Sequence, residues 1–444
     1  MKKSALATVF LVVVIDLMGF GIVLPLLPFY AGEFQASAVV IGLLYSVYSL
    51  MQLIFSPIWG SLSDRIGRRP IMLLSTFGAV LAYIIFGLAE SLTVLLFSRI
   101  VAGVMGGNIS TAQAYIADVT TKEDRAKGMG LIGAAFGIGF VVGPATATLL
   151  IHDSFHSFIA GLGLPGLAEW MTANRYALPG FFAALLSFCS FLMVWFRLEE
   201  TVDTTRERAT TVRRPGVFSP TFWRRLSQQR GESARGLLIP LVIGFFLLSF
   251  GESSLYSSFP LFAEGHLDLT ATDVGVQFFY IGIIVVIVQG FLIRPLTRRF
   301  SEENLFMTGN ILMVIGLGLI PAATSMTMLA FFLGLMAFGK SLNTPTITSL
   351  ISQEADDENV GAVMGTAQGL SGMGRMFGPT WGGALFAIHF GLPFVATALV
   401  VSATIWVGWR LLASNVVSAS TESAEAPGTS AESSAEPEPV EHTR

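Results

Sequence analysis

The chain has 444 residues, of which 53% are hydrophobic and 13% are charged, and its mean hydropathy is +0.68. A soluble domain carries about 25% charged residues, so this composition excludes an ordinary soluble protein and predicts an all-α, polytopic membrane protein. The formal net charge of −4 says little about the apolar part, because residues 413–444 alone contain six Glu and one Arg. The single cysteine, Cys189, excludes an intramolecular disulfide.

Twelve apolar runs are each long enough to span a bilayer as a helix. They occupy roughly residues 5–30, 38–61, 70–89, 92–117, 126–151, 176–196, 236–262, 273–294, 304–324, 326–350, 359–386 and 390–412. With the N-terminus inside, 22 of the 26 Lys and Arg residues fall on the cytoplasmic side. Basic loops stay cytoplasmic, so we expect an integral multi-pass protein with both termini in the cytoplasm. In a prokaryote its membrane would be the plasma (inner) membrane.

A long hydrophilic segment, 197–235, divides the chain into units of six spans each, residues 1–196 and 236–412. The segment holds nine Arg, and we expect it to lie on the inner membrane surface, partly as an amphipathic helix. Residues 413–444 are rich in Ser, Ala, Glu and Pro. This composition cannot bury a core, so it predicts a disordered cytoplasmic tail.

The two units repeat each other in sequence. The spacing of Gly60, Asp64, Arg68 and Arg69 recurs at Gly290, Arg294, Arg298 and Arg299. The spacing of Gly139, Gly143 and Pro144 recurs at Gly374, Gly378 and Pro379. A duplicated six-helix unit is the architecture of a secondary transporter, whose site lies between the halves near the midplane. We therefore predict two pseudo-symmetric six-helix bundles.

These motifs resemble those of the major facilitator superfamily. Gly60-Ser-Leu-Ser-Asp64-Arg65-Ile-Gly67-Arg68-Arg69 resembles the signature loop between the second and third helices of that superfamily. Arg99 followed by Gly103 resembles its fourth-helix arginine motif, and Gly139, Gly143 and Pro144 resemble the motif of its drug:proton antiporters. The opening stretch 15–28, together with Ala114-Tyr-Ile-Ala-Asp118, is similar to the twelve-span tetracycline/proton antiporters.

The resemblance implies the major-facilitator fold and proton-coupled efflux of small amphipathic organic compounds, multidrug or tetracycline-like, by alternating access. The alternative is a proton symporter or uniporter of a metabolite, such as a sugar or an organic anion, on the same fold. The expected partners are a small-molecule substrate and the lipid bilayer, with no nucleic acid, and the expected state is a monomer.

Other classes of protein fit the sequence less well. No nucleophile–base cluster and no nucleotide-binding loop of the Walker type occurs, so we expect neither enzyme activity nor use of ATP, and no cofactor beyond the proton as coupling ion. His152, Asp153 and His156 alone are too few ligands for a metal site. A transporter-like sensor would need folded cytoplasmic elements, which the composition of the tail argues against.

Five ionisable residues fall inside the predicted spans, where each costs at least about 2.5–3.5 kcal/mol and therefore needs a reason. Asp16 and Arg99 are estimated to lie at similar depth, so we expect them to face each other. Asp16 would then be the proton-binding carboxylate, and a static ion pair is the alternative. Glu252 either pairs with Arg375 or is a second protonation site. Lys340 has no evident partner, and it either favours anionic substrates or neutralises a carboxylate.

Two further groups of residues in the spans are candidates for function. Side chains suited to an amphipathic organic substrate, besides Lys340, are Tyr45, Tyr48, Gln52, Asn108, Gln113, Tyr256, Gln277, Tyr280 and Asn343. Their alternative role is packing and hydrogen bonding between helices. Residues expected to let helices approach closely or bend are Gly139, Gly143, Pro144, Gly374, Gly378 and Pro379.

The loop around Gly60–Arg69 is also a candidate gate. Its acidic residue survives only in the first unit, because Arg294 stands in the second where Asp64 stands in the first. The resemblance implies that Asp64 meets the inner end of the span 359–386 across the interface between the units. Arg65, Arg68 and Arg69 can reach Asp118, and with Gly60 and Gly67 these residues would form a charged latch that holds the outward-facing state.

Overall fold

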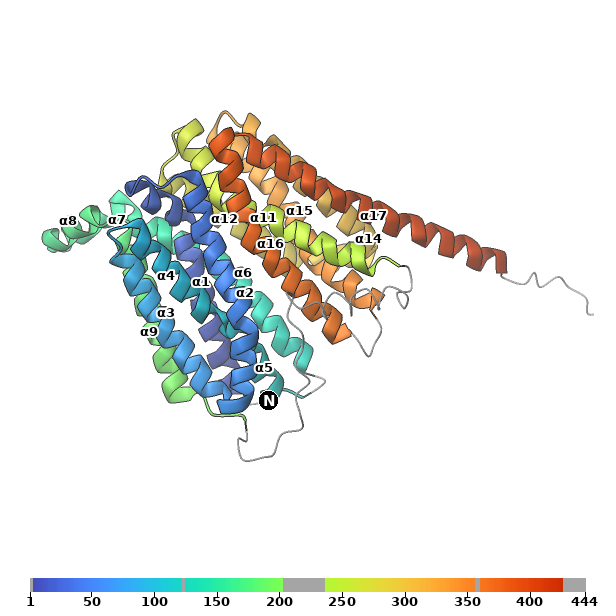
Figure 1. Ribbon diagram of the computed structural model, residues 1–444, viewed down its shortest axis with the longest axis horizontal. Coiled ribbons are helices and arrows are strands. Elements are labelled where there is room, and N and C mark those ends of the chain that lie inside the picture. Colours follow the sequence, from blue (N-terminus) through green and yellow to red (C-terminus); the bar gives the residue numbers. More distant parts are fainter. Residues whose placement is uncertain (1–2, 122–123, 203–235, 356–359, 426–444) are drawn as a thin grey trace, which may run out of the picture.

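The computed structural model describes residues 3–121, 124–202, 236–355 and 360–425, and within these ranges every regular element is a helix. The first half comprises α1 (Lys3–Glu33), α2 (Ala38–Ile66), α3 (Arg68–Gly87), α4 (Leu92–Met105), η1 (Gly106–Asn108), α5 (Ile109–Val119), α6 (Arg125–Ile151), α7 (Asp153–Gly161), α8 (Pro165–Ala173) and α9 (Ala177–Arg197). The second half comprises α11 (Leu238–Leu267), α12 (Ala271–Ile287), η3 (Val288–Leu292), α13 (Ile293–Arg299), α14 (Glu302–Leu319), η4 (Ile320–Ala322), α15 (Met326–Glu354), α16 (Val360–Ile388) and α17 (Leu392–Glu425). The two sets of helices lie on opposite sides of the molecule (Figure 1).

In the described part of the chain, 11 helices are long and apolar enough to cross a membrane. They coincide with eleven of the predicted spans. The remaining prediction, 359–386, coincides with α16, which has 29 residues. Its many glycines, together with Gln368 and Arg375, make α16 less apolar than the others. The chain is thus an integral, multi-pass, all-α membrane protein.

In two of the spans a turn of another helical geometry joins two α-helices. The predicted span 92–117 is made of α4 and α5 joined by the 3-10 turn η1, where the pair Gly106-Gly107 weakens the α-helix. The predicted span 273–294 runs from α12 through the π-helical turn η3 into α13. Such turns commonly mark functional positions inside helices.

The structure adds helices in two regions outside the predicted spans. The segment after α6 forms two short helices, α7 and α8, joined by a turn in which Gly163 adopts φ +83°. The last helix, α17, continues to Glu425, so the beginning of the predicted disordered tail is helical, in keeping with its Ala and Glu content. The amphipathic helix expected within 197–235 falls largely on residues 203–235, outside the described residues.

The helices run between two faces of the molecule. We call the face that holds the start of α1 and the α2–α3 loop the N-terminal face, and the opposite one the far face. Several helices that begin at the far face carry a Ser or Thr N-cap whose side chain accepts a backbone N–H, namely Ser37, Ser91, Thr270 and Ser325. These caps fix where α2, α4, α12 and α15 start, and hence the level of the residues inside them.

The halves are joined mainly by two helix pairs, α2 with α16 and α6 with α12. One hydrophobic cluster runs across both halves and includes Leu24, Leu44, Phe259 and Phe278. A second cluster, around Val12, lies at the N-terminal face and draws only on the first half. The apolar core that joins the halves therefore lies toward the far face.

Candidate transport site and gates

Asp16 of α1 lies inside the first half and is bound by Asn108. The Asn108 side-chain amide donates a hydrogen bond of 2.6 Å to Asp16 Oδ2. The 3-10 turn η1 presents Asn108 at this point, and Asn108 itself is buried. The other carboxylate oxygen, Oδ1, is buried without a hydrogen-bond partner in the described part of the chain. A buried carboxylate oxygen without a donor is costly as a charge and is well suited to hold a proton.

Arg99 does not face Asp16, so the expected pairing is wrong for this structure. The Arg99 guanidinium lies over the Phe86 ring at 4.9 Å, and its Nε is 3.3 Å from Ser98 Oγ. Asn108, which does meet Asp16, lies nine residues further along the same span, about 13 Å nearer the N-terminal face. The expected pairing rested on the depth of each residue in the membrane, estimated by counting residues along its helix. That estimate assumes that the two helices are parallel, and it becomes inaccurate when they are tilted. Tyr48 is close enough to interact electrostatically with both Asp16 and Arg99.

A second charged group lies in the second half, where Lys340 of α15 forms an ion pair with Glu252 of α11. The Tyr256 hydroxyl donates to Glu252 Oε1 at 2.7 Å. Arg375 instead donates to Ser371 Oγ at 2.9 Å and reaches Glu252 only through longer-range electrostatic attraction. The expected Glu252–Arg375 pair is therefore not formed, and Glu252 pairs with Lys340 instead. Of the two roles considered for Lys340, the structure shows the one in which it neutralises a carboxylate.

Aromatic rings connect these charged groups across the halves. Phe20 of α1 stacks on Tyr48 at 5.1 Å between ring centroids and meets Phe140 of α6 edge-on at 5.9 Å. The Lys340 ammonium lies 5.7 Å from the centroid of the same Phe140 ring. Sequence reasoning missed both phenylalanines. Phe20 could have been found, because it follows Asp16 by four residues and so shares its helix face, whereas nothing in the sequence marks Phe140.

A second aromatic contact also bridges the halves, between Tyr45 of α2 and Tyr256 of α11, whose ring centroids are 6.2 Å apart. Tyr45 donates its hydroxyl hydrogen to the Leu24 carbonyl at 2.5 Å. Gln52 donates to the Gly106 carbonyl at 3.1 Å, which holds α2 against η1. These contacts bring four predicted residues, Tyr45, Tyr48, Gln52 and Tyr256, into one region with Asp16 and Glu252.

The remaining predicted substrate residues lie elsewhere. Asn343 is buried with its amide packed directly on Gly309 of α14, inside the second half. Tyr280 places its hydroxyl against Gly334 of α15. Gln277 is buried, and Gln113 is exposed near the N-terminal face. The structure therefore places Asn343 and Tyr280 in helix packing.

The loop Gly60–Arg69 forms a charged cluster centred on Arg68. Arg68 lies 2.5 Å from Asp64 and 3.1 Å from Asp118, and it also donates to Ser63 Oγ at 2.7 Å. Arg65 is exposed. Asp64 is thus held by its own half, and in the described part of the chain no ion pair joins it to α16.

Glu200, just beyond α9, completes this cluster and was missed by sequence reasoning. Its two carboxylate oxygens accept the backbone N–H groups of Arg68 and Arg69 at 2.9 and 3.1 Å, so it caps the N-terminus of α3. Gly67 adopts φ +108° there, and a Cβ on it would collide with the Glu200 carboxylate. The sequence could have indicated Glu200, because the acidic pair Glu199-Glu200 lies shortly after a predicted span.

The glycines and prolines of α6 and α16 divide into two groups. Gly139, Gly143 and Pro144 pack against Leu17, Met18 and Gly21 of α1, within the first half. Gly374 and Gly378 pack against α11, within the second half. Across the halves, Gly42 of α2 meets Pro379, and Thr380 donates to Ser46 Oγ at 2.7 Å. The close approach of the halves therefore extends from the far face to about the middle of the helices, where Gly137 meets Val286 and Gly372 meets Leu53.

Toward the N-terminal face the same helices are apart. Cβ atoms added at Gly130 and Gly133 of α6, or at Gly361 and Gly365 of α16, would meet no heavy atom within 4 Å in the described part of the chain, apart from their own helix backbone and chain neighbours. Figure 1 shows the two halves diverging toward this face. The structure thus has the halves joined at one face and separated at the other.

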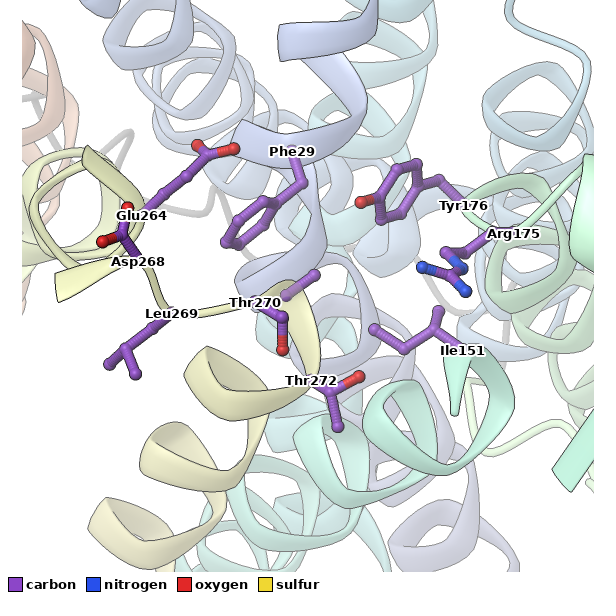
Figure 2. Close-up of a pocket in the computed structure, with 10 residues that line it drawn as sticks. Phe29, Ile151, Arg175, Tyr176, Glu264, Asp268, Leu269, Thr270 and Thr272 are labelled. Atoms are coloured by element: carbon purple, nitrogen blue, oxygen red, sulfur yellow. The ribbon is translucent and has the colours of Figure 1, made fainter. Parts of the chain in front are cut away.

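A pocket of about 350 Å³ marks the seam at the far face. Figure 2 shows Arg175 and Tyr176 of the first half on one side of it, and Glu264 and Asp268 of the second half on the other. Burial raises the pKa of the Tyr176 hydroxyl, and the nearby Glu33 acts in the same direction. This phenol therefore stays neutral at the seam.

Comparisons with known proteins fit this architecture. A model described as Major Facilitator Superfamily matches residues 9–304 and 241–441. The chain is 31% identical to the tetracycline resistance protein, class C, of Escherichia coli, over 87% of this chain and 90% of that protein. It is 27% identical to multidrug resistance protein 2 of Bacillus subtilis (strain 168), over 90% of this chain and 95% of that protein. These relatives confirm the resemblance to the superfamily and to its tetracycline exporters.

Two solved structures share the fold. The human organic anion transporter MFSD10 (TETRAN) superposes with a TM-score of 0.64 at 23% identity, covering 91% of this chain and 99% of that one. A bacterial homolog of the human lysosomal transporter Spinster, in an inward-facing and occupied conformation, superposes with a TM-score of 0.70 at 14% identity, covering 93% and 97%.

Proposed function

Because this chain belongs to the major facilitator superfamily of membrane transporters, we propose that it exports small amphipathic organic compounds in exchange for protons, by alternating access between its two halves. The observation that carries the coupling is Asp16, a carboxylate inside a membrane-spanning helix with one oxygen bound by Asn108 and the other without a donor among the described residues. The tetracycline and multidrug resistance relatives support the class of substrate.

In this proposal Asp16 takes up and releases the coupling proton. When the site is closed to water, burial favours the neutral carboxylic acid. When it opens, hydration and the Arg99 cation beyond Tyr48 favour the carboxylate. Asn108 can serve both states, because its amide donates to the carboxylate and its carbonyl can accept from the acid after a side-chain flip. The proton therefore leaves on the side to which the site is open.

Glu252 has a different role in this proposal. Lys340 and Tyr256 both donate to its Oε1, and two donors stabilise an ionised carboxylate. We assign Glu252 and Lys340 to a permanent ion pair that shapes the second-half wall. Phe140 lies beside Lys340 of this pair, and Phe20 and Tyr48 extend the aromatic surface from Phe140, which gives an organic substrate a flat apolar wall.

The gates act at opposite faces. With the far face joined and the N-terminal face apart, substrate would enter from the N-terminal face. In the opposite state the glycine contacts at the far face separate, and the inner end of α16 approaches the Arg68 cluster. The charged latch would then close the N-terminal face, where Asp64 can exchange Arg68 for a partner on α16.

The test is uptake into everted membrane vesicles from an efflux-deficient bacterial host, driven by an imposed pH gradient. A drug-susceptibility panel that includes tetracycline first identifies a substrate. We expect Asp16→Asn to retain substrate binding and to lose gradient-driven uptake. The matched control is Asp124→Asn, which neutralises a carboxylate that pairs with Lys127 near the N-terminal face. Full gradient-driven uptake by Asp16→Asn would overturn the coupling role, and flux in the opposite direction would support a metabolite symporter.

A further inference from the structure

The hairpin of α7 and α8 is remote from the Asp16 site and from the Arg68 cluster, and it carries an exposed apolar face. The exposed fractions are 60% for Phe158, 59% for Leu162, 47% for Leu167 and 42% for Trp170. Between residues 154 and 173, Glu169 is the only Asp, Glu, Lys or Arg. So much exposed apolar surface on two short helices is unfavourable in water.

This face is held in a fixed position. The His156 ring is buried, with Nε2 at 2.8 Å from the Leu150 carbonyl and Nδ1 at 3.1 Å from Thr172 Oγ1. With a proton on Nε2 the imidazole donates to the Leu150 carbonyl, while Nδ1 lies beside the Thr172 hydroxyl, which itself donates to the Ala168 carbonyl at 2.9 Å. Asp153, at the start of α7, forms an ion pair with Arg175, just before α9. The hairpin is thus fastened to the ends of α6 and α9.

The apolar face continues the lipid-facing surface of the first half. Figure 1 shows α7 and α8 projecting sideways from the far face, beyond the membrane-spanning helices. The Trp170 ring lies 6.1 Å from the ring of Phe181, on the first turns of α9. Below it, α9 exposes Leu185 and Phe188, as a helix in contact with acyl chains does. Tryptophan concentrates at the boundary between headgroups and acyl chains, and the place of Trp170 above these lipid-facing residues suits that level.

We infer that the α7–α8 hairpin lies in the bilayer leaflet at the far face, with its apolar face on the acyl chains, and anchors the first half to that leaflet. Its low charge points to insertion driven by apolar contact and not to attraction by anionic headgroups. Arg175 and Tyr176 follow the hairpin directly and line the pocket in Figure 2. The anchor thus fixes the first-half wall of the far-face seam relative to the membrane.

Single cysteines in a Cys189→Ser background test the assignment in the full-length protein. The positions are Leu162 and Leu167 on the apolar face, with Ser157 and Glu169 as matched positions about 100° or more around the same helices. Each is labelled with bimane and reconstituted in nanodiscs of phosphatidylcholine, with and without a lipid that carries a doxyl quencher on its acyl chain. Thermal melting of each labelled variant confirms that it is folded.

We expect doxyl lipid to quench the labels at Leu162 and Leu167 strongly, and aqueous iodide to quench them several-fold less than those at Ser157 and Glu169. Equal access of iodide to all four positions, without doxyl quenching, would place the hairpin in water and overturn the inference. Protection of Leu162 and Leu167 from both quenchers would mean that protein covers the face, which also overturns it. Neither outcome bears on proton coupling, which the Asp16→Asn experiment tests separately.

Discussion

The ion pair between Glu252 and Lys340 allows a sharp test of how charge is balanced inside the second half. Their side chains are 24% and 21% exposed, so the pair is mostly buried. Removing one partner of a fully buried pair costs about 3–5 kcal/mol, because the other charge is left without compensation. Partial exposure puts the cost here near the lower end, about 3 kcal/mol.

Lys340→Met and Glu252→Gln should lower the melting temperature by different amounts, and the structure indicates which loss is larger. In Lys340→Met, Glu252 keeps the Tyr256 hydroxyl and the attraction of Arg375. In Glu252→Gln, the Lys340 and Arg375 cations remain without an anion between them. We therefore expect Glu252→Gln to lower the melting temperature more than Lys340→Met does.

The double variant, Glu252→Gln with Lys340→Met, should recover most of the loss, because neither charge is then unpaired. The assay is the melting temperature of the purified protein in one detergent, followed by tryptophan fluorescence. A double variant whose loss equals the sum of the single losses would show that the two groups are not coupled. A larger effect of Lys340→Met than of Glu252→Gln would refute the role given to Arg375.

Substitutions at three further positions test other contacts. Glu200→Gln should lower the melting temperature by the equivalent of about 1 kcal/mol, since it removes the negative charge at the N-terminus of α3, and Glu200→Ala should lower it further. In Gly42→Leu the new side chain should collide with Pro379 and open the far-face seam. Maleimide labelling of Ser46→Cys in a Cys189→Ser background would then be several-fold faster, and an unchanged rate would contradict the closed seam. Phe20→Ala should raise the KM for an aromatic substrate with little change in maximal rate, and an unchanged KM would remove Phe20 from the site.

The helices could be predicted from the sequence because bilayer thickness imposes a strong one-dimensional signal. About twenty apolar residues between polar loops identify a span, whatever it packs against. The hairpin of α7 and α8 escaped that signal, because its helices have only nine residues each and contain Gly and Pro. The repeat was visible because the spacing of Gly139, Gly143 and Pro144 recurs at Gly374, Gly378 and Pro379.

The pairing of charges was less predictable, because it depends on helix rotation and tilt. Lys340 and Glu252 are 88 residues apart, and nothing local relates them. Asp16 and Arg99 were expected to meet because their counted depths agree, yet Asp16 meets Asn108, two and a half turns away from Arg99 on the same span. Side chains on neighbouring helices meet only when they lie at the same depth and both helices are rotated so that the side chains face each other. The sequence gives only the approximate depth.

The two gates differ in a way that follows from their residues. At the far face, closure rests on backbone contacts at Gly42 and on the apolar core, which release no charge when they part. At the N-terminal face, Arg68 cannot be left without an anion in a partly buried position. In the proposed closed state Asp118 would remain bound to Arg68 when Asp64 turns toward α16, so the latch would exchange partners without exposing a bare charge. Arg294 holds the equivalent position in the second half and cannot supply that anion. The proposed charged latch is therefore single and belongs to the first half, because the repeat does not reproduce its acidic residue.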